Sequence, residues 1–250
     1  MKNFKKLFIF MVLNLFFCCD YANTNIQAQV LIESKLEHQN FNKICKQLGI
    51  KCIDDQTKLY SVRGNNDAYY LIDSTPSIYR LKNMGSEFVL LDQWNFKDYP
   101  HSHASPVHEG ELQRNGLKIF PALYPLNKNE IAVAIIDDWF IGYSGGGRHE
   151  QYADFVQLDK NGKYKLAISY VLFYSSEMIR ACFSQQEYIT SPHCHDEAGT
   201  MLNIKFLDTG LNYFRWILNY KDYSWASHTS EKKKIIKKYS EMIIPFQNSN

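Results

Sequence analysis

The pattern of apolar and polar positions divides the chain into a helix at each end and a long run of short strands between them. In residues 29–49 the apolar positions recur at roughly helical spacing, and Gly49 suits the end of a helix. From residue 58 onward, short apolar-rich runs alternate with turn-forming residues about every ten positions, which is typical of an antiparallel meander. Asn161-Gly162 marks one hairpin turn. The predicted strands cover residues 59–62, 68–72, 78–81, 87–91, 117–123, 130–143, 152–158, 163–174, 178–183, 201–207 and 212–223.

The C-terminal segment, residues 230–245, predicts a second helix. Ser230 suits its N-cap and Pro245 ends it. One face is apolar and the other carries five lysines, as in a terminal helix docked on the fold, although a basic amphipathic helix can also lie on a membrane. The apolar positions are Ile235, Ile236, Tyr239, Met242 and Ile243.

Helices and strands are therefore segregated along the chain, which excludes a repeating strand-helix-strand fold. The sequence predicts an α+β fold that is mainly β. Its expected form is a large antiparallel sheet or β-sandwich of about ten strands, flanked by an N-terminal and a C-terminal helix.

The first 28 residues have the pattern of a secretory signal peptide, and residues 29–250 are expected to form a single exported, β-rich domain. Three lysines precede an apolar run at residues 7–19, which is too short for a comfortable transmembrane helix. Cleavage after Ala28 or after Ala22 is compatible with this pattern. A third possibility is lipidation at Cys18 or Cys19, although bulky residues precede both cysteines.

Removal of this segment changes the charge balance and the cysteine count. The full chain has 28 Lys+Arg and 26 Asp+Glu, and a cut after Ala28 takes away three lysines and Asp20. The remaining protein is neutral, so bulk charge gives no reason to expect nucleic-acid binding. Four of the six cysteines remain and allow three pairings. The expected pairing closes the two short loops, Cys45–Cys52 and Cys182–Cys194, in an oxidising compartment.

Histidines gather in two places. His101, His103 and His108 lie in a polar stretch, residues 98–116, that predicts a long surface loop. Two histidines separated by one residue point to the same side of an extended segment, so these three could bind Zn²⁺ and leave a position open to water. Their spacing resembles part of the metallo-β-lactamase-type motif but lacks its Asp. In the second place, His193 and His195 flank Cys194 and are followed by Asp196 and Glu197.

A glycine-rich stretch begins at Gly142 and contains the other candidate chemistry. Ser144 lies in a G-x-S-x-G pattern, which in a nucleophile elbow needs a strand before it and a helix after it. The following residues predict a strand instead. The same stretch could bind an anion through backbone N–H groups and the Arg148 guanidinium, or simply form a hairpin tip. The ligand-binding candidates are Ser144, Gly145, Gly146, Gly147, Arg148 and His149.

These features favour an exported, periplasmic or secreted binding protein, of inhibitor or immunity type, over an enzyme. The expected partner is an envelope protein or a glycan, with no cofactor and no nucleic acid, and with membrane contact only if Cys18 or Cys19 is lipidated. The alternative is an exported hydrolase that uses zinc at His101, His103 and His108, or Ser144 as nucleophile.

Overall fold

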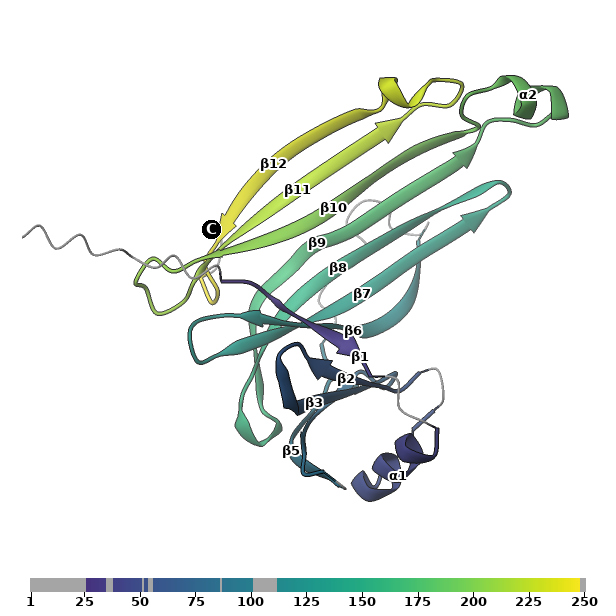
Figure 1. The fold of residues 1–250 in the computed structure, drawn as a ribbon. Helices are drawn as coiled ribbons and strands as arrows, with labels where there is room; N and C mark the ends of the chain where they lie inside the picture. The colour runs from purple at the N-terminus through teal and green to yellow at the C-terminus, as the bar shows by residue number, and fades with distance from the viewer. Residues whose placement is uncertain are drawn as a thin grey trace, which may run out of the picture.

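The computed structural model describes residues 26–34, 38–50, 52–53, 56–85, 87–100 and 112–247. Its main feature is one sheet of twelve antiparallel strands, so the mainly β antiparallel fold is confirmed (Figure 1). All twelve strands are joined in this one sheet, and the alternative of two separate sheets in a sandwich is not supported. The strands are β1 (Gln29–Glu33), β2 (Lys58–Val62), β3 (Asn65–Asp73), β4 (Ser77–Asn83), β5 (Phe88–Asn95), β6 (Gln113–Pro125), β7 (Ile131–Tyr143), β8 (Gly146–Leu158), β9 (Tyr164–Arg180), β10 (His195–Leu207), β11 (Arg215–Trp225) and β12 (Ile235–Ile243).

Two meanders make up the sheet, and the first strand of the chain connects them. The order is β12-β11-β10-β9-β8-β7-β6-β1-β2-β3-β4-β5. Strand β1 pairs with β2 through Leu31 and Val62, and with β6 through Gln29 and Leu123. The hydrogen-bonded continuity of the sheet therefore depends on a strand of five residues.

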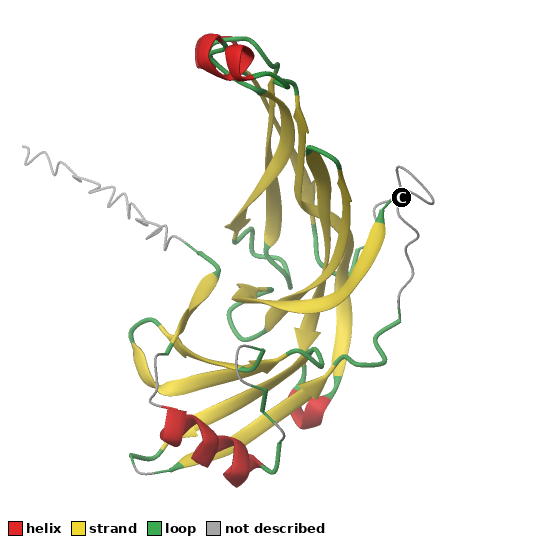
Figure 2. Cartoon of the chain, turned by 90° about the vertical axis from the view of Figure 1, so that its right-hand side faces the viewer, coloured by secondary structure: helices red, strands yellow, loops and turns green. Residues whose placement is uncertain are grey.

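The sheet curls, so its faces bury three apolar clusters (Figure 2). Helix α1 (His38–Leu48) covers one face of β2–β4. The opposite face of β3–β5 packs against β6–β8, with Trp94 and Val133 among the buried residues. The other face of β6–β8 packs against β10 and β11, where Trp216 contacts Phe155. Strand β7 is consequently buried on both faces from Ala132 to Ile136, which explains its uninterrupted apolar sequence.

The predicted N-terminal helix is wrong for its first part. Residues 29–33 form β1, in which Leu31 is buried while Val30 and Ile32 on either side are exposed. This alternation has the period of a strand, and the β-branched side chains favour it. Helical spacing begins only in α1, where Phe41, Ile44 and Leu48 face the sheet.

The predicted C-terminal helix is wrong throughout. Apart from a single 3₁₀ turn at Glu231–Lys233, this segment is the edge strand β12. It pairs with β11 over nine positions, from Trp216–Ile243 to Ser224–Ile235. Eight of its nine residues are exposed, so no buried face selects the helical period, and pairing with β11 determines the conformation.

Both expected disulfides are present. Cys45–Cys52 ties the end of α1 to the segment that follows it, and Cys182–Cys194 joins the end of β9 to the start of β10. Two disulfides indicate an oxidising, non-cytoplasmic compartment. Within the described part of the chain, no helix has the length and apolar character needed to cross a membrane.

Candidate functional site

The long strands β7–β12 extend well beyond the apolar core, and we call this part of the sheet the distal end (Figure 1). It comprises residues 137–151, 174–201 and 221–236, none of which belongs to the three core clusters. Many of its large apolar side chains are nevertheless exposed to solvent. They are Phe140, Tyr143, Met178, Ile179, Phe183, Tyr188, Ile189, Met201, Ile235 and Ile236. Consecutive strand residues such as Met178 and Ile179 point to opposite faces, so these side chains lie on both faces of the distal end.

The glycine-rich stretch forms a hairpin tip at the distal end. Tyr143 pairs with Gly146, so Ser144 and Gly145 are the two central turn residues. Strand β8 begins at Gly146 and runs to Leu158. The strand-turn-helix geometry of a nucleophile elbow is therefore missing at Ser144.

Close approach of neighbouring backbone explains the three consecutive glycines. A Cβ atom at Gly146 would lie 2.0 Å from the Met178 carbonyl oxygen, and one at Gly147 would lie 2.8 Å from the Ile141 carbonyl oxygen. Gly145 has a φ of +91°, which L side chains rarely adopt. The glycines therefore fit the hairpin against β9, and an anion site is not needed to account for them.

Arg148 is engaged in an ion pair within its own strand. Its Nε donates to Oε1 of Glu150 over 2.8 Å, and the Glu150 side chain is only 3% exposed. The Tyr152 hydroxyl donates to the other Glu150 oxygen over 2.7 Å. Burial, followed by this hydrogen bond to Glu150, raises the pKa of Tyr152 well above its ordinary value. The Arg148 guanidinium thus balances the charge of the buried Glu150 carboxylate. Because it is already paired, the interpretation of Arg148 as a ligand for an external anion is weakened.

His149 belongs to a separate polar cluster around Asp138 of β7. Its Nε2 lies 2.7 Å from Asp138 Oδ1, which also accepts from Lys118 Nζ at 2.9 Å and from Gln151 Nε2 at 2.8 Å. Asn115 Nδ2 donates to Oδ2 over 3.2 Å. Burial acts to raise the pKa of Asp138, but the hydrogen bonds from these four side chains outweigh it and hold the pKa well below its ordinary range.

Asp138 is accordingly expected to make stability depend on pH. Replacing it with asparagine should cost about 2 kcal/mol at pH 7, because several hydrogen bonds to a charged acceptor are weakened. Its folded-state pKa is depressed, so its contribution is fully present above the unfolded value of about 3.9 and is lost as the pH falls below that value. Urea unfolding of the wild type and Asp138→Asn between pH 7 and pH 3 should show the difference shrinking. Exposed Asp67→Asn is the matched control, and a difference that stays constant down to pH 3 would refute this role for Asp138.

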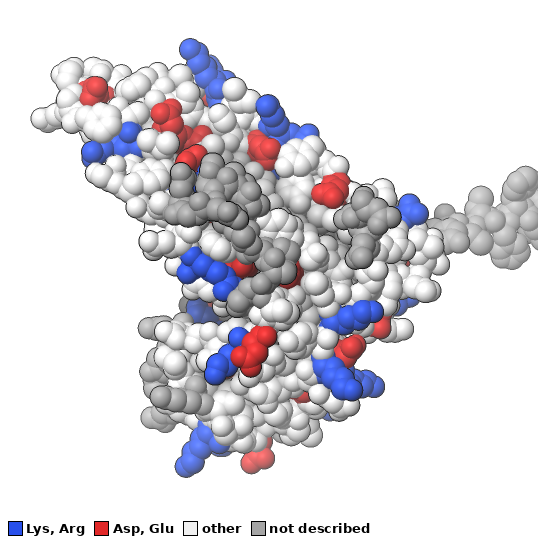
Figure 3. Space-filling view, turned by 180° about the vertical axis from the view of Figure 1, so that it is seen from behind, with Lys and Arg blue, Asp and Glu red and all other residues white. Residues whose placement is uncertain are grey.

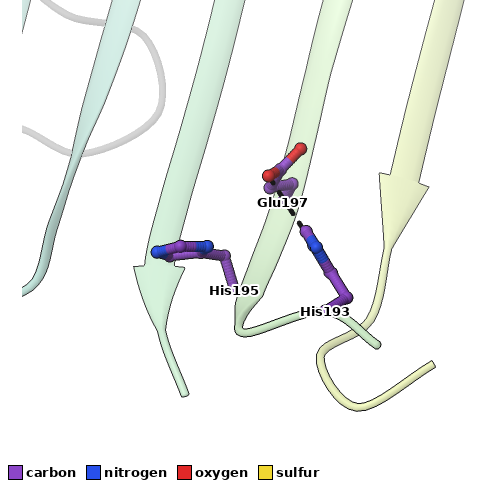
Figure 4. Close-up of side chains that lie close together, drawn as sticks. All are labelled: His193, His195 and Glu197. Carbon is purple, nitrogen blue, oxygen red and sulfur yellow. Dashed lines mark ion pairs between the residues drawn. The ribbon is translucent and has the colours of Figure 1, made fainter. Parts of the chain in front are cut away.

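His193, His195 and Glu197 form a second cluster, at the connection between β9 and β10 (Figure 4). One ligand atom from each lies within 4.8 Å of the other two. His195 and Glu197 are two residues apart on β10 and so share a face. His193 precedes the strand, and its ring stacks on Trp225 of β11 with centroids 3.6 Å apart.

Among the described residues, the histidines lie in more than one place. His149 contacts Asp138, whereas His193 lies near Glu197 and His195. His101, His103 and His108 lie outside the described residues, as do Cys18, Cys19 and the predicted signal peptide. No pattern in the sequence indicates the stacking of His193 on Trp225. Asp138 has a signal, because Asp137 and Asp138 directly follow the continuous apolar run of β7.

Surface charge is mixed on the face shown in Figure 3. Basic and acidic side chains alternate there without a continuous basic area.

We compared the chain with models of protein families, with curated proteins and with solved structures, and none of them matches it.

Proposed function

We propose that this protein is an exported, non-enzymatic binding protein that recognises a protein partner of the periplasm or cell surface through its distal end. Residues 1–28 serve as its signal peptide in this proposal. Two disulfides in a neutral mature chain support a role outside the cytoplasm and away from nucleic acid.

One observation carries the proposal, namely the exposed apolar side chains gathered where the sheet extends beyond its core. Phe183 and Ile189 are each 71% exposed; Phe183 precedes the short helix α2 (Gln185–Thr190) and Ile189 lies within it. Aromatic and methionine side chains are enriched at the centres of protein interfaces. The hairpin tip lies beside them, since the Gly145 carbonyl accepts a hydrogen bond from the Arg180 N–H.

Rigidity at the distal end supports recognition by a preformed surface. The Cys182–Cys194 disulfide closes the segment that carries α2. A capping box between Ser184 and Glu187 fixes the start of that helix. Less conformational entropy is therefore lost when a partner binds.

Photocrosslinking in the native host tests the proposal. A photoreactive amino acid at Tyr143 or at Tyr188 should link the same partner protein, to be identified by mass spectrometry. The same amino acid at Val89, which is 45% exposed on the opposite edge strand β5, is the positional control and should not link it.

A matched pair of variants makes this test specific. Phe183→Ser combined with Ile189→Ser should abolish the crosslink from Tyr143, whereas Val89→Ser combined with Leu91→Ser should leave it intact. The proposal fails if neither distal position links a partner, if the distal double variant has no effect, or if the linked molecule is a second copy of this chain.

A further inference from the structure

We infer that His193, His195 and Glu197 form a binding site for a divalent transition metal, with Zn²⁺ as the ion that fits best. Two imidazoles and one carboxylate are the ligand set of many zinc centres with an open fourth position. These three side chains approach one another closely even though they come from both a loop and a strand. The inference is independent of the proposed protein-binding role.

The strongest observation is the environment of the His193 ring. Its side chain is 8% exposed, and its Nε2 is buried without a hydrogen-bond partner among the described residues. A buried polar atom without a partner is costly and calls for a physical explanation. The nearest carboxylate oxygen, Oε1 of Glu197, lies 3.6 Å away, which is too far for a hydrogen bond.

That separation suits two ligands of one metal ion. With metal–ligand distances of about 2.0–2.2 Å and tetrahedral angles, two ligand atoms lie roughly 3.4 Å apart. Nε2 of His193 and Oε1 of Glu197 are within a few tenths of an ångström of this separation. His195 extends from the same face of β10 as Glu197, and its ring centroid is 5.9 Å from that of His193. One of its ring nitrogens lies within 4.8 Å of the ligand atoms of His193 and Glu197.

The structure also holds the His193 backbone and ring in place. The His193 carbonyl accepts from the His228 N–H at 2.8 Å and from the Ser191 hydroxyl at 2.7 Å. The adjacent Cys194 is fixed by its disulfide to Cys182. Parallel stacking on Trp225, with an interplanar angle of 2°, sets the orientation of the ring. Such preorganisation is what a metal ligand requires of its surroundings.

Three protein ligands leave at least one coordination position for water or for a group on another molecule. Asp196 does not fill it, because it faces the other side of β10, where its carboxylate accepts from the Ser227 N–H at 2.7 Å. Cys194 is excluded by its disulfide. Zn²⁺ at this site would tie the segment that carries α2 to strand β10.

Calorimetric titration of the full chain with Zn²⁺, with disulfides intact, tests the site. One Zn²⁺ should bind per chain. His195→Ala and Glu197→Gln should each raise the Kd by at least about 10-fold, because each removes a ligand. Both side chains are partly exposed, so these variants are expected to fold, which circular dichroism verifies. Co²⁺ in place of Zn²⁺ supplies a second readout, since its visible absorption reports the coordination number and should disappear in both variants.

Two controls distinguish this site from the other histidines. His149→Ala and the triple variant His101→Ala/His103→Ala/His108→Ala should leave the Kd unchanged. The inference is overturned if the wild type binds no Zn²⁺. It is equally overturned if the Kd is unchanged in His195→Ala and Glu197→Gln, or if only the triple variant weakens binding.

Discussion

Replacing Trp216 with alanine is expected to lower the free energy of unfolding by about 4 kcal/mol, a loss typical of a large aromatic removed from a core. Trp216 is completely buried at the meeting of β6, β8, β10 and β11. Its ring lies within 5.9 Å of Tyr124 and within 5.0 Å of both Phe155 and Phe206. Alanine would leave a cavity lined by three aromatic rings that cannot all move into it.

Urea unfolding of the oxidised protein measures this loss, and two controls interpret it. Trp216→Phe should cost much less, because the ring is largely replaced and a buried Nε1–H without a hydrogen-bond partner among the described residues is removed. Exposed Phe183→Ala should change the free energy by no more than about 0.5 kcal/mol. A Trp216→Ala variant as stable as Phe183→Ala would show that β10 and β11 do not pack on β6–β8 as described.

Replacing Arg148 with methionine should cost about 3 kcal/mol, the second largest effect we expect, because it leaves the Glu150 carboxylate buried without its cation. Among the described residues, the Tyr152 hydroxyl would be the remaining hydrogen-bond donor to Glu150. Methionine occupies a similar volume, so the loss reports the charge rather than a cavity.

The double variant Arg148→Met/Glu150→Gln should recover most of this loss. Glutamine is neutral, and its amide oxygen can still accept from Tyr152. Chemical unfolding at pH 7 of the wild type, both single variants and the double variant forms a complete cycle. Equal losses for Arg148→Met and for the double variant would mean that Glu150 does not need a cation.

The sequence predicted the strands well where continuous apolar runs extend over many residues, as in β7, whereas it predicted only residues 152–158 of β8. The prediction was wrong where the helical period and the strand period both fit the same residues. Ile235, Ile236, Tyr239 and Ile243 satisfy a helical stripe almost as well as a strand, and only the pairing with β11 decides between them. Val30 to Ile32 are too few to reveal a strand whose partners lie far along the chain.

The candidate site was predictable in its residue types but not in its contacts. The spacing of His195 and Glu197 places them on one face of a strand, whereas His193 comes from the loop before it. Their relation to Trp225 depends on the β10–β11 register, which no local pattern specifies. The glycines at 145–147 were interpreted as an anion-binding site. The close approach of the Met178 and Ile141 carbonyl oxygens to Gly146 and Gly147, which accounts for two of these glycines, is visible only in the structure.

The position of β1 between β2 and β6 has a consequence for the order in which this protein can fold. Each meander can form from hairpins that close over a few residues, which is fast. Pairing of Gln29 with Leu123 must instead close a loop of roughly ninety residues, and the entropic cost of closure grows with loop length. The two meanders should therefore form early and independently, and insertion of β1 between them should be the late, slow step that completes the native protein.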